Sequence, residues 1–133
     1  MKAIGAKITK GLNLGAYVVS SDNSGARIVK IVSVKRGKSR KGRQIAAGVA
    51  DWVKVSVRIG LPDMKGKVFD AIVIRQRRPY RRLTGERICF ADNAVALLKD
   101  EKGNPKGTQI KGFVAREVME RWSQVAKIAQ GVY

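Results

Sequence analysis

Two short clusters of lysine and arginine are the side chains of this chain best suited to chemistry, and that chemistry is the binding of phosphate. The first cluster comprises Lys35, Arg36, Lys38, Arg40, Lys41 and Arg43. The second cluster comprises Arg75, Arg77, Arg78, Arg81, Arg82 and Arg87. Each phosphate contact releases condensed counterions, and arginine binds a phosphate through two parallel hydrogen bonds. Tyr80 stands within the second cluster, where it could stack on an unpaired base or pack across a hairpin.

The whole chain is strongly basic, with 28 Lys and Arg residues against 10 Asp and Glu residues and a formal net charge of +18 over 133 residues. Because like charges repel, this composition favours a polyanionic partner that neutralises them. A run of charge is usually a solvated surface, but these clusters are nearly free of acids, and Gly37 and Gly42 allow close backbone approach to a phosphate. Those glycines and Pro79 also interrupt any amphipathic helix, so we expect a nucleic acid partner and no membrane contact.

The sequence offers little for catalysis. It has no histidine and a single cysteine, which removes the commonest general base and any structural zinc site. The apolar neighbours of Cys89 predict a small buried core residue rather than a nucleophile. Gly37-Lys38-Ser39 resembles the end of a phosphate-binding P-loop, but that motif requires glycine where Val32 stands. We therefore expect a protein that is not an enzyme and has no catalytic residues, metal or cofactor.

Cysteine content and hydropathy indicate the compartment. A single cysteine forms no internal disulfide, which fits a reducing environment. No apolar run approaches the roughly 20 residues that a membrane-spanning helix needs. The first 25 residues lack the apolar region of a signal peptide. We expect a soluble, intracellular protein.

A body of short β-strands must position the two clusters. Residues 52–59 alternate in hydropathy, and the side predicted to face the core carries Val53, Val55, Val57 and Ile59. Further strands are predicted over residues 17–20, 27–34, 69–75, 88–90 and 95–98. Turn sequences separate them, among them Thr84-Gly85, the predicted tip of a tight hairpin. Short strands with closely spaced turns predict a small β-barrel or sandwich, and the length predicts a single domain over residues 1–133.

The hydropathy pattern changes from strand to helix spacing near residue 113. Apolar side chains recur at helical intervals at Val114, Val118, Met119 and Trp122. Glu117 and Arg121 form an i,i+4 pair in the favourable order, and Ser123 is a candidate cap for a second short helix that ends near Ala129. We therefore expect a barrel body over about 12–112 and a helical C-terminal region over about 113–129.

Composition alone does not distinguish RNA from DNA as the partner, but motifs and their placement bear on the choice. The chain has no helix-turn-helix, zinc finger or basic zipper, and both clusters fall at loops or hairpin tips. That arrangement favours irregular folded RNA without excluding DNA. An RNA chaperone or single-strand binder is a second hypothesis, although it would need a platform of exposed aromatic side chains and the chain has only eight, dispersed. An RNA-processing enzyme is a third, weakened by the lack of histidine.

Four motifs in register resemble the universal large-subunit ribosomal protein L-fourteen family, in its archaeal and eukaryotic branch. They are Ser-Asp-Asn-Ser-Gly-Ala-Arg at residues 21–27, Ala-Ile-Val-Ile-Arg-Gln at 71–76, Phe-Ala-Asp-Asn-Ala at 90–94, and the stretch 107–117 that ends in Val-Ala-Arg-Glu. The resemblance extends from about residue 12 to residue 133. It departs at Thr84, where many relatives have Asp, and at Ser123, where eukaryotic relatives have proline. Residues 36–44 match less closely than residues 75–82, so RNA contacts carry over to them less directly.

The resemblance implies a mainly β fold: a closed five-stranded antiparallel β-barrel with short C-terminal helices. It implies a non-catalytic structural constituent of the large ribosomal subunit in the cytoplasm, bound to large-subunit rRNA and bridging to small-subunit rRNA across the subunit interface. The implied protein partners are large-subunit protein three, the protein called L-twenty-four-e, and the anti-association initiation factor six, which docks on the C-terminal part. The outer face of the predicted helices could serve such partners through Arg116, Met119, Glu120 and Trp122. For Trp122 itself, core packing is the favoured role.

Overall fold

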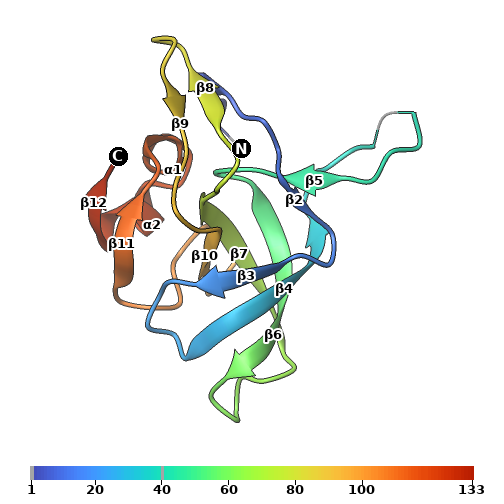
Figure 1. Cartoon of the computed structure of the whole chain (residues 1–133). Coiled ribbons are helices and arrows are strands. Elements are labelled where there is room, and N and C mark those ends of the chain that lie inside the picture. The colour runs from blue at the N-terminus through green and yellow to red at the C-terminus, as the bar shows by residue number, and fades with distance from the viewer. Residues whose placement is uncertain (1, 40) are drawn as a thin grey trace.

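A computed structural model describes residues 2–39 and 41–133, and within them a β-barrel is surrounded by smaller two- and three-stranded sheets and two short helices (Figure 1). The strands are β1 (Ala6–Lys7), β2 (Leu12–Asn13), β3 (Tyr17–Ser20), β4 (Ala26–Val34), β5 (Ala46–Ala47), β6 (Trp52–Gly60), β7 (Val68–Arg75), β8 (Tyr80–Arg82), β9 (Arg87–Ile88), β10 (Ala94–Leu97), β11 (Ile110–Val114) and β12 (Ala129–Val132). The helices are α1 (Arg116–Arg121) and α2 (Ser123–Lys127). In the described part of the chain neither is long or apolar enough to cross a membrane.

Five strands close into a barrel in the order β10-β3-β4-β6-β7, which confirms the predicted five-stranded barrel. The expectation that every pair is antiparallel was wrong at one seam. There β10 runs parallel to β3, with Ala94 opposite Val19 and Val95 opposite Ser20. A parallel pair needs a long connection between its strands, and here most of the barrel and the β8–β9 hairpin lie between β3 and β10 in the chain.

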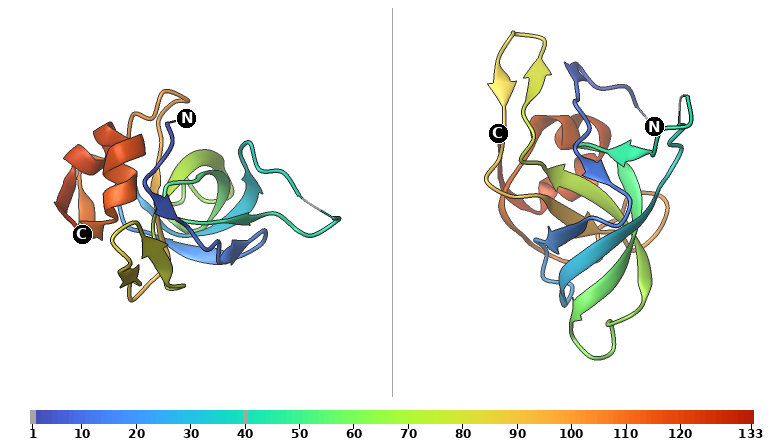
Figure 2. Two further views of the ribbon diagram at one scale, coloured as in Figure 1. Left: turned by 90° about the horizontal axis from the view of Figure 1, so that it is seen from above. Right: turned by 45° about the vertical axis from the view of Figure 1, so that its right-hand side comes forward.

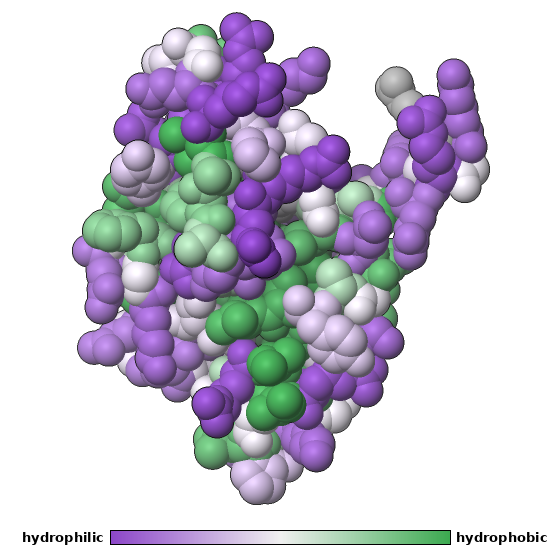
Figure 3. Space-filling model, in the orientation of Figure 1, coloured by the Kyte–Doolittle hydropathy of each residue, from purple (hydrophilic) through white to green (hydrophobic). Residues whose placement is uncertain are grey.

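Two basic segments project from the end of the barrel that lies opposite the β6–β7 turn (Figures 1 and 2). We call residues 35–45, between β4 and β5, the basic arm, and residues 77–88, which include β8 and β9, the basic hairpin. Figure 3 shows hydrophilic side chains gathered over both projections. The barrel therefore acts as a mount from which the two clusters extend in different directions.

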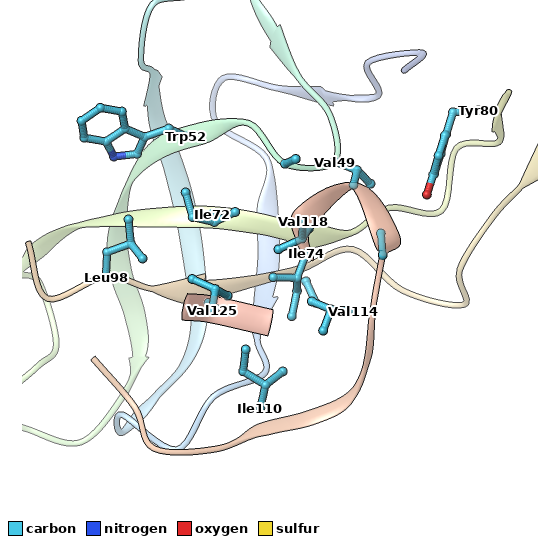
Figure 4. Close-up of a cluster of buried hydrophobic side chains, with 14 of the residues drawn as sticks. Val49, Trp52, Ile72, Ile74, Tyr80, Leu98, Ile110, Val114, Val118 and Val125 are labelled. Atoms are coloured by element: carbon cyan, nitrogen blue, oxygen red, sulfur yellow. The ribbon is translucent and has the colours of Figure 1, made fainter. Parts of the chain in front are cut away.

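Two apolar clusters share strand β7. Ala71 and Val73 face the barrel interior, whereas Ile72 and Ile74 face the C-terminal elements. The second cluster, drawn in Figure 4, includes Ile110, Val114, Val118 and Val125. Burying one valine or isoleucine side chain stabilises the fold by about 1.5–3 kcal/mol. Because residues 71–74 of β7 are covered on both faces, they form a continuous apolar run rather than an alternating one.

Two residues predicted to lie in the core are exposed. Ile59 is 51% exposed, because bulges in the β4–β6 pairing on both sides of Ile28 shift the register there. Cys89 is also exposed, since it follows the buried Ile88 and successive residues of an extended chain point to opposite sides. The interpretation of Cys89 as a buried core residue was therefore wrong.

The C-terminal region differs from the expectation in three ways. Val114 ends strand β11, which pairs in parallel with β12, so the first helix begins only at Arg116. Ser123 is the first residue of α2 rather than its cap, and that helix has no side-chain cap hydrogen bond. Glu117 forms its ion pair with Arg82 of β8 rather than with Arg121. A buried partner from a distant strand thus replaced the local pair that the spacing predicted.

Candidate nucleic-acid interface

The basic arm presents four described cations to solvent. They are Arg36, Lys38, Lys41 and Arg43. Arg36 and Lys41 have positive φ angles of 57° and 55°, which turn the backbone at the two ends of the loop. Lys35, at the base, is half-buried, with its Nζ 4.8 Å from the centre of the Trp52 ring and 4.0 Å from a carboxylate oxygen of Glu101. Arg40 lies outside the described residues.

The basic hairpin exposes four of the arginines predicted for it. They are Arg77, Arg78, Arg81 and Arg87. At the tip the Gly85 amide donates to the Arg82 carbonyl, and φ of Gly85 is 90°, so the Thr84-Gly85 turn was correctly predicted. At the base, the buried Gln76 amide donates to the carbonyls of Thr9 and Arg78 and accepts from the Val49 amide. The hairpin is thus held at both ends before any ligand is present.

Arg75 does not reach the surface with the other arginines. It is 8% exposed, and its guanidinium donates to Asp92 at 2.9 Å and to the Ser21 hydroxyl at 2.6 Å. Further bonds run to the carbonyls of Lys111 at 2.9 Å and Phe113 at 2.8 Å. These contacts tie β7 to β11 and use the donors that a phosphate would need, so we no longer assign an RNA contact to Arg75.

Arg82 and Tyr80 are also buried, at 6% and 0% exposure, against helix α1. Arg82 Nε lies 2.8 Å from Glu117 Oε1, the Tyr80 hydroxyl donates to Glu117 Oε2 at 2.7 Å, and Arg82 also donates to the Tyr133 carbonyl. Burial and the Glu117 carboxylate raise the pKa of Tyr80, which therefore stays a neutral donor. Burial alone would lower the pKa of Arg82, but its bonds to Glu117 and Tyr80 raise that pKa overall.

This burial decides between the two roles considered for Tyr80. A base cannot stack on a ring with no exposed face, so the structure supports the packing role. Arg82 is buried as well, so its guanidinium is not accessible for the RNA contact that the sequence predicted. Alternation along β8 explains why Arg81 points outward while its two neighbours point inward.

The structure adds one cation, Lys7, that the sequence did not group with the hairpin. Strand β1 pairs with β8, which sets the exposed Lys7 opposite Arg81. Gly11 lies against the Arg78 side chain, where an added Cβ would come within 2.9 Å of it. Lys7 precedes the start of the hairpin by 70 residues and β1 is only two residues long, so no sequence signal joined them.

The candidate protein-contact residues lie on α1 and the residue after it. Arg116, Met119 and Glu120 are exposed on the outer side of α1. Trp122 is half-buried, donates from Nε1 to the Ala50 carbonyl at 2.9 Å, and meets the Trp52 ring edge-on. Core packing is therefore the role the structure gives Trp122, and a helix face with three exposed side chains remains.

Comparison with known sequences identifies the family. The family model described as ribosomal protein L14p/L23e matches residues 11–133. The chain belongs to this family. Large ribosomal subunit protein uL14 of Nanoarchaeum equitans is 55% identical over 130 residues, which cover 98% of each chain. The proteins of the same name from Methanothrix thermoacetophila and Thermoplasma acidophilum are each 46% identical over 129 residues, with 97% of each chain covered. The L14p/L23e match thus includes the barrel, both projections and the C-terminal helices.

Proposed function

We propose that this chain is a non-catalytic structural constituent of the large ribosomal subunit in the cytoplasm. Its membership of the L14p/L23e family and the names of its relatives support the assignment. In this proposal the barrel is a rigid mount, and the basic arm and basic hairpin bind folded large-subunit rRNA.

One observation carries the RNA contact: eight exposed cations stand on two projections at one end of the barrel. They are Arg36, Lys38, Lys41, Arg43, Arg77, Arg78, Arg81 and Arg87. Within the described residues, none of the eight is within ion-pair distance of a carboxylate. Cations without an ion-pair partner keep their full charge for phosphates. The packed core of the barrel supports the two projections that carry them.

The mechanism is charge neutralisation combined with shape fit. Phosphate and ribose contacts fix position and carry no sequence information, so we expect little base-specific readout. Two projections that extend in different directions suit a folded RNA whose helices approach from more than one side.

The remaining proposals concern the neighbours. We propose that the chain also bridges to small-subunit rRNA across the subunit interface. Its proposed protein neighbours are large-subunit protein three and the protein called L-twenty-four-e. Initiation factor six would dock on α1 through Arg116, Met119 and Glu120, which are exposed there.

The experiment measures binding to a large-subunit rRNA fragment across a salt series. Replacing the four exposed hairpin arginines with alanine should weaken binding and reduce the slope of log K against log salt by about 3, since each phosphate contact contributes about 0.7–0.9. The matched control replaces four exposed lysines away from both projections, Lys65, Lys67, Lys106 and Lys127. Equal losses in the two variants would show that net charge alone drives binding, and a flat salt response of the wild type would refute the proposal.

A further inference from the structure

A row of branched apolar side chains crosses three strands on the outer face of the barrel. Val19 of β3 lies opposite Ile28 of β4, and Ile28 lies opposite Ile59 of β6. Val19 and Ile59 are 44% and 51% exposed. Single exposed apolar residues are normal, but a contiguous strip is typical of a binding surface.

This row lines a groove of about 670 Å³. The other lining residues are those at 20–23 and 25–27, in and around the β3–β4 turn, and Lys111 of β11. In Figure 3 an apolar strip runs over β3 and β4 with hydrophilic groups beside it. The volume falls within the range of sites that hold small ligands or short segments of chain.

Internal hydrogen bonds hold the turn side of the groove. Asn23 Oδ1 accepts from the amides of Thr108 at 2.7 Å and Gln109 at 3.2 Å. The buried Asp22 carboxylate accepts from the hydroxyls of Ser20 and Ser24 and from the Leu97 amide. Because these bonds exist before any ligand arrives, binding would order little of the wall.

The accessible charge of the groove is positive. Arg27 and Lys111 are exposed, and neither has an ion-pair partner among the described residues. Asp22 does not offset them at the surface, since it is 5% exposed and its oxygens accept internal bonds. An apolar floor with a cationic rim is complementary to an apolar segment that carries carboxylates.

We propose that the groove binds an extended acidic peptide segment of another protein, with apolar side chains on the Val19–Ile28–Ile59 row and carboxylates at Arg27 and Lys111. Three neighbouring strands span about 10 Å, and alternate side chains of an extended segment are about 7 Å apart, so two of them fit along the row. The next residue in such a segment points away from the floor, where a carboxylate can reach the rim.

RNA fits this surface less well than protein does. None of the described residues that line the groove is aromatic, so an unpaired base finds no flat platform. Ile59 lies near the β6–β7 turn, at the end of the barrel away from both basic projections. The groove is thus a second surface, separate from the proposed RNA contacts.

The test titrates the ¹⁵N-labelled full chain with a ten-residue peptide that alternates valine and glutamate. We expect amide shifts at residues 19–28, at Ile59 and at residues 107–111. Ile59→Asp and Lys111→Glu should each weaken binding about tenfold, and the milder Ile59→Thr about threefold. Val32→Asp and Lys99→Glu are the matched controls, because both side chains are exposed outside the groove, and they should change affinity less than twofold.

Several outcomes would overturn the inference. They are shifts confined to the basic arm and hairpin, equal losses in the control variants, equal binding of a valine–lysine peptide, or stronger groove binding by a single-stranded oligoribonucleotide. The rRNA fragment provides the separate check on the proposed function. Ile59→Asp should leave rRNA binding unchanged, and a wild type that binds the peptide but not rRNA would refute the proposed function and leave the groove assignment standing.

Discussion

Removing the carboxylate of Glu117 should destabilise the protein more than any change at the exposed arginines. Glu117 is 3% exposed, and its two oxygens accept from Arg82 Nε at 2.8 Å and from the Tyr80 hydroxyl at 2.7 Å. In Glu117→Ala the Arg82 guanidinium remains buried without its counter-charge, and the Tyr80 hydroxyl loses its acceptor. Both losses occur where β8 of the basic hairpin meets α1.

The magnitude follows from these contacts. Deleting one partner of a buried ion pair costs about 3–5 kcal/mol, and that range already includes much of the cost of about 1–3 kcal/mol for an unpaired hydroxyl. Domains of this kind are stable by about 5–15 kcal/mol. Glu117→Ala should therefore remove about a fifth or more of the total. With a urea m value of about 2 kcal/mol/M, a loss of about 4 kcal/mol moves the unfolding midpoint by about 2 M.

Urea unfolding followed by the fluorescence of Trp52 and Trp122 measures this effect. Glu120→Ala is the matched control, because Glu120 lies on the same helix and is exposed, and it should change stability by less than about 0.5 kcal/mol. The triple variant Tyr80→Phe, Arg82→Met, Glu117→Leu should recover most of the loss, since apolar residues of similar size often replace a buried ion pair without cost. A loss below about 1 kcal/mol for Glu117→Ala would refute the reasoning.

Three further predictions follow from the same contacts. Arg75→Ala should lower the unfolding free energy by about 2–4 kcal/mol, because it leaves Asp92 and two carbonyls without their donor. The dependence of rRNA binding on salt should keep the same slope. A reduced slope would show that Arg75 contacts RNA. The raised pKa of Tyr80 means that the folded state holds its proton more tightly than the unfolded state. The contribution of this proton to the free energy of unfolding is complete below about pH 10 and is lost as pH rises further. Tyr80→Phe should therefore flatten the alkaline part of the curve of unfolding free energy against pH. An unchanged curve would contradict this role of Tyr80. The two apolar clusters share β7, so the chain should unfold as a single domain, with circular dichroism and tryptophan fluorescence giving one coincident transition; separate midpoints would indicate two units.

Local hydropathy patterns predicted much of the barrel correctly. The alternation over residues 52–59 and the β-branched runs at 27–34 and 69–75 correspond to β6, β4 and β7 within a residue or two. Such patterns are reliable because a strand with one buried face repeats every two residues. The pairs β2–β5 and β11–β12 were not predicted, because strands of two to five residues that join distant segments have too little periodicity to detect.

The sequence by itself determined that the protein is a strongly basic β-protein with two segments rich in lysine and arginine, because composition and period-two hydropathy are local properties. It could not separate the arginines within a segment, since Arg75, Arg81 and Arg82 have the same chemistry and lie only a few residues apart. Tertiary structure decided among them. The alternation of side chains along the paired strands places Arg75 against Asp92 and Arg82 against Glu117, and it leaves Arg81 exposed to solvent. It also brought Val19, Ile28 and Ile59 into one row, because only the pairing of three strands makes neighbours of side chains so far apart in the chain.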